Sequence, residues 1–515
     1  MYNIFGDYMF AKIKSEGIYG INTFDVTVEA DISSGLPRFD VVGLPDAAVK
    51  ESRERVRASI KNSGYTFPIS RITVNIAPAD VKKEGSFYDL PILVSLLKAS
   101  SQLKGATYDY SFIGELSLDG EIRGVNGVLP MVLQAKENGV GAVFVPFENA
   151  DEGSVVSGID VLPARHINDV LAHLSGEKLI TPAFKELDEE SVLMETLDFA
   201  DVKGQAKVKR ALEVAAAGGH NCIMIGTPGT GKSMMAKRLG SIMPQMTFDE
   251  QIETTKIYSV AGELPRGARL IAKRPFRAPH HTVSAQGLTG GGTSPKPGEI
   301  SLAHNGVLFM DEFPEFDRRA KESLRQPLED GIVTITRASG TVTYPSDIML
   351  VAAMNPCPCG YAGHPTIECT CSDAARKRYN DKISGPILDR IDIHVEVSTV
   401  NYEQLRGDKK EESSEQIRQR INTARSIQNE RFKGTPVKCN AKMTPAMTRK
   451  FCILSEDADA LMNASYDAIG MSPRAHDKIL RISRTIADLA SSETIEVSHV
   501  AEAIQYRTLD RKYWR

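Results

Sequence analysis

The sequence lacks the features that mark several special classes of protein. Seven Cys among 515 residues are too few for a scaffold held together by disulfides. Lys and Arg number 62 against 66 Asp and Glu, so the net charge of −4 does not by itself indicate a nucleic-acid partner. No apolar run approaches the roughly eighteen residues of a membrane helix, and the first residues, MYNIFGDYMF, do not resemble a secretory signal. We therefore expect a soluble, cytoplasmic protein with no membrane partner.

The composition is that of an ordinary globular protein, with 42% hydrophobic and 25% charged residues. The pattern along the chain divides it into regions. Residues 1–175 mix β-type runs with helical stretches, and 176–200 form an acidic linker. Residues 201–400 alternate strand-like and helix-like segments, and 401–515 have helical periodicity, apart from a polar stretch at 407–415 that we expect to be an exposed loop. The fold class predicted is α/β, with a parallel sheet in the middle region, an α+β domain before it and a helical lid after it.

A phosphate-binding loop follows a short apolar strand, where residues 221–233 read NCIMIGTPGTGKS. Glycines let backbone N–H groups curl round phosphates, Lys232 supplies a positive charge, and the Ser233 hydroxyl is a ligand for Mg²⁺. A helix-compatible run follows the motif. The sequence therefore predicts bound ATP and Mg²⁺. The expected binding residues are Gly226, Thr227, Pro228, Gly229, Thr230, Gly231, Lys232, Ser233 and Met234.

Two further apolar strands end in polar side chains suited to a nucleotide cleft. The first, 306–312, reads GVLFMDE, and we expect Asp311 to hold Mg²⁺ and Glu312 to polarise the attacking water. The second, 348–355, reads IMLVAAMN and ends in Asn355, whose amide is suited to orient water or the γ-phosphate. Together with the phosphate-binding loop, these strands predict ATP hydrolysis.

An arginine further along the chain is a candidate for a role between subunits. Arg390 follows Leu388 and Asp389, and an arginine presented to a neighbouring subunit's nucleotide stabilises the charge that develops on the γ-phosphate. A surface ion pair is the alternative for any single arginine.

The ordered segments GTPGTGKS, VLFMDE, AAMNPCPCG, GPILDRID and SPRAHDKILRISR, with FRAPHHTVS at 276–284, resemble the magnesium-chelatase-like branch of the AAA+ ATPases. More closely, they are similar to the YifB/ComM family over nearly the whole chain. The resemblance implies that Asn355 is sensor 1, Arg390 the arginine finger and Arg474 sensor 2. It also implies a ring, a homohexamer, since a finger acting on another subunit's nucleotide requires a neighbour.

The N-terminal region is similar to the proteolytic domain of Lon-type proteases, chiefly at residues 80–90 and 114–135. A Ser–Lys dyad needs a hydroxyl at a loop tip and an amine close enough to take its proton. In our alignment Phe87 occupies the serine position and Leu129 the lysine position, although Ser86 is adjacent. We interpret the region as a Lon-like scaffold without peptidase chemistry that serves assembly or substrate binding.

Four cysteines, Cys357, Cys359, Cys369 and Cys371, form two CxC pairs. Four thiolates satisfy tetrahedral Zn²⁺, which predicts a structural zinc site that pins the loop after Asn355. Buried free cysteines are the alternative.

Two basic elements are candidates for contacts with DNA phosphates. Lys273, Arg274 and Arg277 gather near Arg266 and Arg269, ahead of a glycine-rich segment, and a solvated basic loop is the alternative. Adjacent His280 and His281 follow; neighbouring histidines point apart on most backbones, so we do not expect a metal there. Residues 332–344 alternate as in a β-hairpin with Arg337 near the turn, and this hairpin resembles the pre-sensor-1 hairpin of MCM helicases. Subunit packing is the alternative role for the hairpin.

These observations leave three functional hypotheses. The first, implied by the family resemblance, is a ring-forming ATP-dependent DNA motor: a ComM-like helicase or branch-migration factor in recombination or natural transformation. It would bind branched or single-stranded DNA without sequence preference. The second is a chelatase-type remodelling or metal-insertion ATPase, and the third is a Lon-like ATP-dependent protease.

Overall fold

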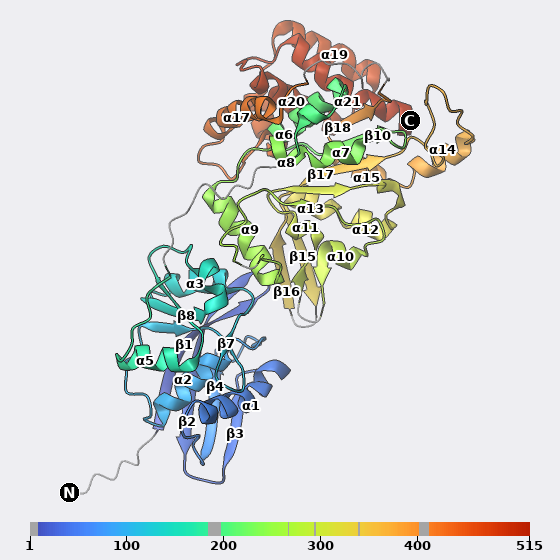
Figure 1. Ribbon diagram of the computed structural model, residues 1–515. Helices are drawn as coiled ribbons and strands as arrows, with labels where there is room; N and C mark the ends of the chain where they lie inside the picture. The colour runs from blue at the N-terminus through green and yellow to red at the C-terminus, as the bar shows by residue number, and fades with distance from the viewer. Residues whose placement is uncertain are drawn as a thin grey trace, which may run out of the picture.

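The protein is described here from a computed structural model (Figure 1). The structure describes residues 9–183, 197–265, 267–292, 295–337, 340–400 and 411–514. Most of the predicted acidic linker, 184–196, therefore lies outside the described residues. Two bodies with separate sheets lie on either side of it, the N-terminal one coloured blue to teal in Figure 1.

The N-terminal body is built on a seven-stranded sheet of order β3-β4-β2-β1-β5-β8-β9. Its long strands β1 and β2 pair antiparallel along their whole length, and alternate residues of β2 (Val26, Val28, Ala30, Ile32) are buried in one core. Helix α2 lies against β1 and β2, with almost all of its residues buried. The strands are β1 (Met9–Tyr19), β2 (Asn22–Ser33), β3 (Arg38–Val42), β4 (Arg71–Ala77), β5 (Tyr110–Phe112), β6 (Glu115–Leu116), β7 (Ile122–Arg123), β8 (Ala142–Pro146) and β9 (Asp160–Ala164). The helices are α1 (Ala47–Asn62), α2 (Asp89–Ala99), α3 (Val128–Glu137), α4 (Ala150–Gly153) and α5 (Ile167–Ser175).

The second body contains a five-stranded sheet of order β11-β14-β17-β10-β18, in which every pairing is parallel. Its central strands are continuous apolar runs because helices cover both faces of a parallel sheet, and each residue of β10, β14 and β17 is buried. The strands are β10 (Cys222–Gly226), β11 (Phe276–Arg277), β14 (Val307–Met310), β17 (Met349–Met354) and β18 (Ile393–Val397). The helices along this part of the chain include α6 (Ala206–Gly218), α7 (Lys232–Lys237), α8 (Leu239–Ile242), α9 (Phe248–Ala261), α14 (Asp373–Asn380) and α15 (Gly385–Leu388). The predicted α/β fold class is confirmed.

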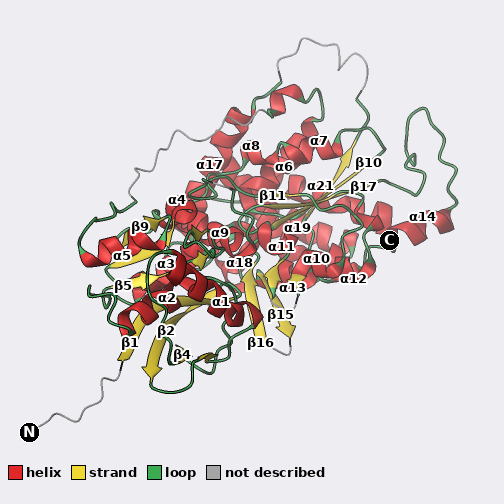
Figure 2. Ribbon diagram, turned by 60° about the horizontal axis from the view of Figure 1, so that its bottom comes forward, coloured by secondary structure: helices red, strands yellow, loops and turns green. Residues whose placement is uncertain are grey.

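Additional elements are inserted on one side of this sheet. The antiparallel hairpin of β15 (Ile332–Arg337) and β16 (Gly340–Pro345) pairs Arg337 with Gly340, so the predicted hairpin is confirmed, with Arg337 at its turn. Figure 2 shows the hairpin projecting beside the N-terminal body. The other elements are α10 (Ala285–Thr289), β12 (Gly290–Gly291), β13 (Lys296–Pro297), α11 (Glu299–Leu302), α12 (Arg318–Glu322) and α13 (Arg325–Asp330).

The C-terminal part is helical, as predicted. In α20 the hydroxyl of Ser472 accepts the first-turn hydrogen bond, Pro473 opens the helix, and its apolar stripe of Ile479, Ile482 and Ile486 is buried. The helices are α17 (Ser414–Arg431), α18 (Pro445–Phe451), α19 (Glu456–Ile469), α20 (Pro473–Leu489) and α21 (Val497–Trp514). None of the helices in the described parts of the chain combines the length and the apolar character needed to cross a bilayer.

The polar stretch 407–415 is not the exposed loop that we expected throughout. Its first residues, 407–410, lie outside the described residues, but Glu411 pairs with Lys209 at 2.8 Å. Ser413 forms a capping box with Gln416, so α17 begins at Ser414. The expectation was wrong for this second half because polar residues also form helix caps.

The two bodies touch along α9 and the hairpin. The backbone N–H of Gly127 donates to the carbonyl of Ser259 at 3.2 Å, and the Ser259 hydroxyl hydrogen-bonds Glu152, a buried carboxylate that also accepts from the Leu129 N–H at 2.8 Å. At the hairpin, a Cβ on Gly340 would lie 2.4 Å from the Tyr19 hydroxyl. A side chain at position 340 would require the Tyr19 ring to move, so the hairpin turn lies close against the end of β1.

Candidate functional site

The phosphate-binding loop lies at the carboxyl end of β10, where Gly229 and Gly231 adopt positive φ angles of 79° and 88°. The Lys232 ammonium donates to the carbonyls of Gly226 (2.6 Å) and Thr227 (3.1 Å) and to Oδ1 of Asn355 (3.1 Å). Burial lowers the pKa of Lys232, and the carboxylates of Asp311 and Glu312 oppose that shift. The ammonium is thus held inside the loop by neutral oxygens that phosphate oxygens can replace.

Side chains from three neighbouring strands meet at this edge. The Ser233 hydroxyl donates to Oδ2 of Asp311 at 2.5 Å, and Asp311 directly follows β14. Asn355 follows β17, and both strands run parallel to β10, so their carboxyl ends emerge together. The Ser233 and Asp311 oxygens are hard ligands of the kind Mg²⁺ takes alongside phosphate. The structure therefore gathers Lys232, Ser233, Asp311 and Asn355 as the sequence predicted.

Glu312 has a partner that sequence reasoning missed. Its backbone is left-handed, with φ of 51°, and its Oε2 lies 3.2 Å from Nδ1 of His281. The rings of His280 and His281 lie 4.1 Å apart, so our expectation that they point apart is wrong. The signal was available, because residues after β11 emerge beside those after β14 in a parallel sheet.

We expect His281 to position the Glu312 carboxylate. A His281→Ala substitution should lower kcat for ATP hydrolysis by about tenfold while leaving KM for ATP nearly unchanged, since the ring contacts the acid and not the phosphate loop. His281→Gln, which retains a hydrogen-bond donor, should recover part of the rate. Steady-state kinetics test this, with His280→Ala as the neighbouring control; a rise in KM at constant kcat would contradict it.

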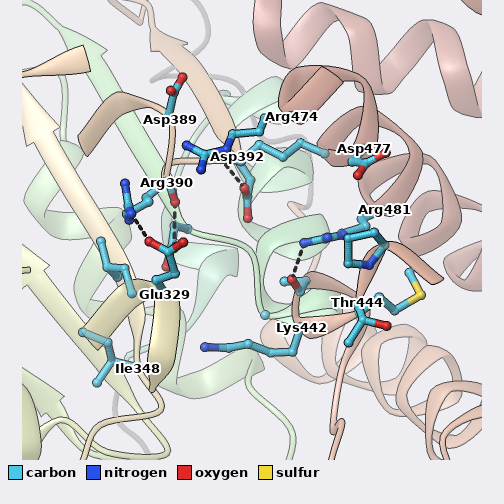
Figure 3. A pocket seen from close by; sticks show the side chains of 17 residues that line it. Glu329, Ile348, Asp389, Arg390, Asp392, Lys442, Thr444, Arg474, Asp477 and Arg481 are labelled. Atoms are coloured by element: carbon cyan, nitrogen blue, oxygen red, sulfur yellow. Dashed lines mark hydrogen bonds and ion pairs between the residues drawn. The ribbon is translucent and has the colours of Figure 1, made fainter. Parts of the chain in front are cut away.

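Arg390 and Arg474 lie at the opposite edge of the same sheet. They line a pocket of about 460 Å³ that includes Asn221, Ile348 and Asp392, which directly precede β10, β17 and β18 (Figure 3). The five residues of β10 separate this edge from the phosphate-binding loop by about 16 Å, at about 3.3 Å per residue. The structure thus brings the two arginines together but not to the phosphate-binding loop of their own chain.

The pocket is densely charged. Arg390 pairs with Glu329 and donates to the carbonyl of Pro386 at 2.8 Å. Asp392 accepts from Lys478 at 2.9 Å and faces His220 at 3.3 Å. Burial alone would raise the pKa of Asp392, but the Lys478 ammonium and the His220 ring hold it well below its usual range. Arg474, Arg481 and Lys442 complete a rim with a surplus of cationic groups.

The two basic elements differ in how free their side chains are. Arg337 is exposed at the hairpin turn, and a Cβ on Gly291 would lie 2.8 Å from its Nη2, so the turn adjoins the glycine-rich segment. The Arg277 guanidinium is instead held by Glu299 (2.7 Å) and Glu263 (3.1 Å).

Arg274 is also engaged within the protein, through Glu250 at 2.8 Å and the carbonyl of Pro244 at 2.7 Å. Arg269 reaches Ser154 of the N-terminal body at 3.5 Å. Lys273 is exposed, and Arg266 lies outside the described residues. The geometry does not favour Arg274 and Arg277 as phosphate contacts, because carboxylates already occupy both guanidinium groups.

The N-terminal region has no arrangement of a serine peptidase at the aligned positions. Phe87 and Leu129 are buried in the core, and the Ser86 hydroxyl donates to the carboxylate of Glu115. A carboxylate hydrogen-bonded to the serine does not replace the lysine amine of a Ser–Lys dyad.

The four cysteines of the CxC pairs are brought together, with all four sulfur atoms within 4.8 Å of one another. The cluster begins two residues after Asn355 and so lies next to the edge of the sheet that carries the phosphate-binding loop.

Comparison with known proteins shows which family the chain resembles. Residues 198–405 match the family model described as magnesium chelatase, subunit ChlI. Residues 28–149 match subunit ChlI of Mg-chelatase, and 411–507 match the C-terminal part of subunit ChlI.

Relatives of similar length extend the match to almost the whole chain. Competence protein ComM of Haemophilus influenzae is 42% identical over 509 residues, covering 97% of this chain and 98% of its own. The uncharacterized protein YifB of Escherichia coli is 41% identical over 510 residues, covering 97% of each. Weaker, partial similarity reaches DNA replication licensing factor mcm6 of Schizosaccharomyces pombe (24% over 302 residues, 56% of this chain and 29% of its own). It also reaches a Lon protease of Mycolicibacterium smegmatis (26% over 156 residues, 28% of this chain and 20% of its own). By this near full-length identity the chain belongs to the YifB/ComM family of magnesium-chelatase-like AAA+ proteins.

Proposed function

We propose that this protein is an ATPase that assembles into a ring, a homohexamer, and uses ATP hydrolysis to move along DNA. One observation carries the ring: the sheet bears the phosphate-binding residues at one edge and Arg390 with Arg474 at the other. In a head-to-tail ring, each nucleotide would receive Lys232 from one subunit and the two arginines from the next.

In the proposed reaction the residues at the nucleotide edge have distinct roles. Lys232 would exchange its carbonyl partners for the β- and γ-phosphates. Asn355, which accepts a hydrogen bond from the Lys232 ammonium in this structure, would orient the γ-phosphate. Ser233 and Asp311 would hold Mg²⁺, which supplies charge neutralisation between the phosphates. Glu312, held in position by His281, would take the proton of the attacking water.

Arg390 would act on the neighbour's nucleotide as an arginine finger, and Arg474 would contact the same phosphates. The pairing of Arg390 with Glu329 neutralises both groups in the single chain. A γ-phosphate arriving from a neighbour would compete with Glu329 for the guanidinium, because it also offers bidentate oxygens and carries more negative charge than a carboxylate.

DNA is the proposed substrate because of Arg337. It stands exposed at a hairpin turn beside the glycine-rich segment, and a guanidinium in this position can pair with a phosphate. The ComM name of one relative and the DNA replication name of another support this choice. Branch migration in recombination or natural transformation is the specific activity that we propose.

Replacing Arg337 should weaken DNA binding without affecting ATP binding. Arg337→Ala is expected to weaken binding about equally for different sequences and to reduce the slope of log affinity against log salt by about one for each subunit in contact. Fluorescence anisotropy on a labelled four-way junction measures both. Arg418→Ala, at a half-buried arginine on α17, is the matched control and should behave as wild type. Equal affinity of the Arg337 variant and wild type at every salt concentration would refute the contact.

A chelatase-type ATPase is the second candidate, because all three matching family models carry the magnesium chelatase description. ATPase rates distinguish the two: DNA should stimulate a DNA motor, while a chelatase-type enzyme would respond to a metal-accepting partner and not to DNA.

We also expect no peptide hydrolysis. Peptidase activity that is lost on Ser86→Ala would instead establish the Lon-like alternative. Zinc at the four cysteines is a further proposal, and four reduced thiols suit the cytoplasm.

A further inference from the structure

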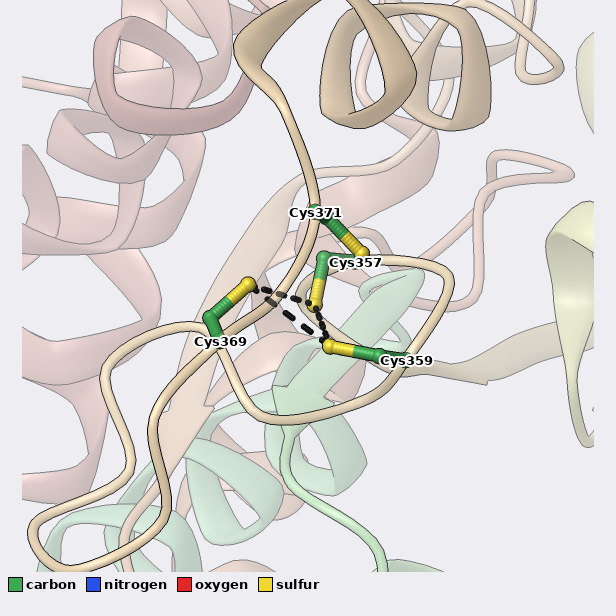
Figure 4. A group of neighbouring side chains, drawn as sticks. All are labelled: Cys357, Cys359, Cys369 and Cys371. Atoms are coloured by element: carbon green, nitrogen blue, oxygen red, sulfur yellow. Dashed lines mark hydrogen bonds between the residues drawn. The ribbon is translucent and has the colours of Figure 1, made fainter.

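The four cysteine sulfurs form a compact group on one loop between β17 and α14 (Figure 4). Sγ of Cys357 lies 3.4 Å from that of Cys359 and 3.6 Å from that of Cys369, and Cys359 lies 3.6 Å from Cys369. Bonded sulfurs would lie about 2.05 Å apart, so none of these pairs is a disulfide. Two CxC turns, 357–359 and 369–371, face each other across the gap.

These distances match a single tetrahedral ion. With zinc–sulfur bonds of about 2.3 Å, the sulfurs of a tetrahedral site lie about 3.8 Å apart, close to the separations present. The four sulfurs are too close together for an iron–sulfur cluster, with its own sulfides, to lie among them. A mononuclear divalent ion also supplies the positive charge that four neighbouring thiolates need.

The loop that carries the cysteines lies against the phosphate-binding loop. Gly360, at φ of 86°, approaches Pro228 so closely that a Cβ there would lie 2.7 Å from the proline Cγ. The turn is tied to the first cysteine, because the Gly360 N–H donates to the Cys357 carbonyl at 3.0 Å and the Ala362 N–H reaches the Cys357 sulfur at 3.3 Å. The same loop starts at Asn355, which contacts Lys232.

We propose that Cys357, Cys359, Cys369 and Cys371 bind one zinc ion, and that this ion clamps the 357–371 loop against Pro228 and thereby supports nucleotide binding. The second part rests on the proposed function, since it requires that the phosphate-binding loop hold ATP. The ion has four protein ligands and no open position, so its role is structural.

Metal analysis of the full-length protein tests the first part. Protein purified without chelator should contain about one zinc per chain by mass spectrometry of metals, and the Cys359→Ser/Cys369→Ser variant should contain almost none. Cys359→His, which supplies another zinc ligand, should retain it. Cys452→Ala removes a buried cysteine outside the cluster and is the control. Absent zinc in the wild type, iron at the same stoichiometry, or zinc retained by the double serine variant would overturn the site.

Binding of a fluorescent ATP analogue tests the second part. The double serine variant should bind it at least about fivefold more weakly than wild type, with circular dichroism verifying that the chain is folded. Gly360→Ala should weaken binding similarly while retaining zinc, because it disturbs the contact with Pro228 and not the thiols. Unchanged affinity in both variants would overturn the clamp. If wild type failed to bind nucleotide, the proposed function would fail, while the zinc measurement would still decide the site.

Discussion

Glu312→Gln is expected to reduce ATP hydrolysis by about 10²- to 10⁴-fold while leaving ATP binding intact. The amide keeps the size of the side chain but cannot accept the proton of the attacking water. The Lys232, Ser233 and Asp311 side chains that we propose hold the nucleotide act independently of Glu312, so the affinity for ATP should change little. Single-turnover phosphate release and nucleotide binding, measured on the same preparation, separate the two effects.

The control for this variant lies three residues away. Glu315 is an exposed carboxylate paired with Lys382, so Glu315→Gln removes the same charge from the same short segment without touching the proposed site. It should retain near wild-type hydrolysis. A Glu312→Gln protein that hydrolyses ATP within a few-fold of wild type would show that another group activates the water.

If Arg390 is the arginine finger that we propose, Arg390→Ala should reduce hydrolysis by about 10³-fold or more, the effect of losing a finger that acts across an interface. Glu329→Gln provides the matched control, because it breaks the same ion pair and keeps the arginine. Its hydrolysis rate should be at or above the wild-type rate, since Arg390 no longer has to leave a carboxylate.

Mixing variants distinguishes action across an interface from action within a chain. Arg390→Ala and Glu312→Gln subunits should each hydrolyse ATP very slowly alone, but in a mixed ring of the proposed kind some interfaces would combine an intact Glu312 with an intact Arg390 from the neighbour. Partial recovery of hydrolysis is therefore expected. No recovery in rings shown to be mixed, by co-purification of one variant with a tagged copy of the other, would place Arg390 in its own subunit's reaction, against the separation of about 16 Å along β10.

Much of the fold was predictable because its signals are local. Apolar runs such as VLFM and MLVAAM are typical of buried parallel strands, and the alternation in 332–344 is typical of a hairpin; both are confirmed. The gathering of Lys232, Ser233, Asp311 and Asn355 followed from the rule that parallel strands end at one edge. The roles of these residues stay predictions.

Contacts between distant segments could not be predicted. The carboxylates that hold Arg274 and Arg277 come from α9, α11 and the loop after α9. The sequence alone therefore suggested that these arginines were freer to bind DNA phosphates than the structure shows. Periodicity also did not indicate that Arg390 and Arg474, 84 positions apart in the sequence, share one pocket. The contact of His281 with Glu312 is different, because the parallel pairing of β11 with β14 could have indicated it, and sequence reasoning missed it.

The close fit of Gly340 against Tyr19 has a mechanical consequence. Because the hairpin turn and the end of β1 are in contact, and α9 is hydrogen-bonded to the N-terminal body as well, a displacement of the hairpin would disturb its contacts with that body. If ATP hydrolysis shifts Arg337, as in the proposed function, we expect the seven-stranded sheet to move with it. The N-terminal body would then follow every turnover of ATP, and a reporter fixed to its outer strands would register the cycle without touching the hairpin.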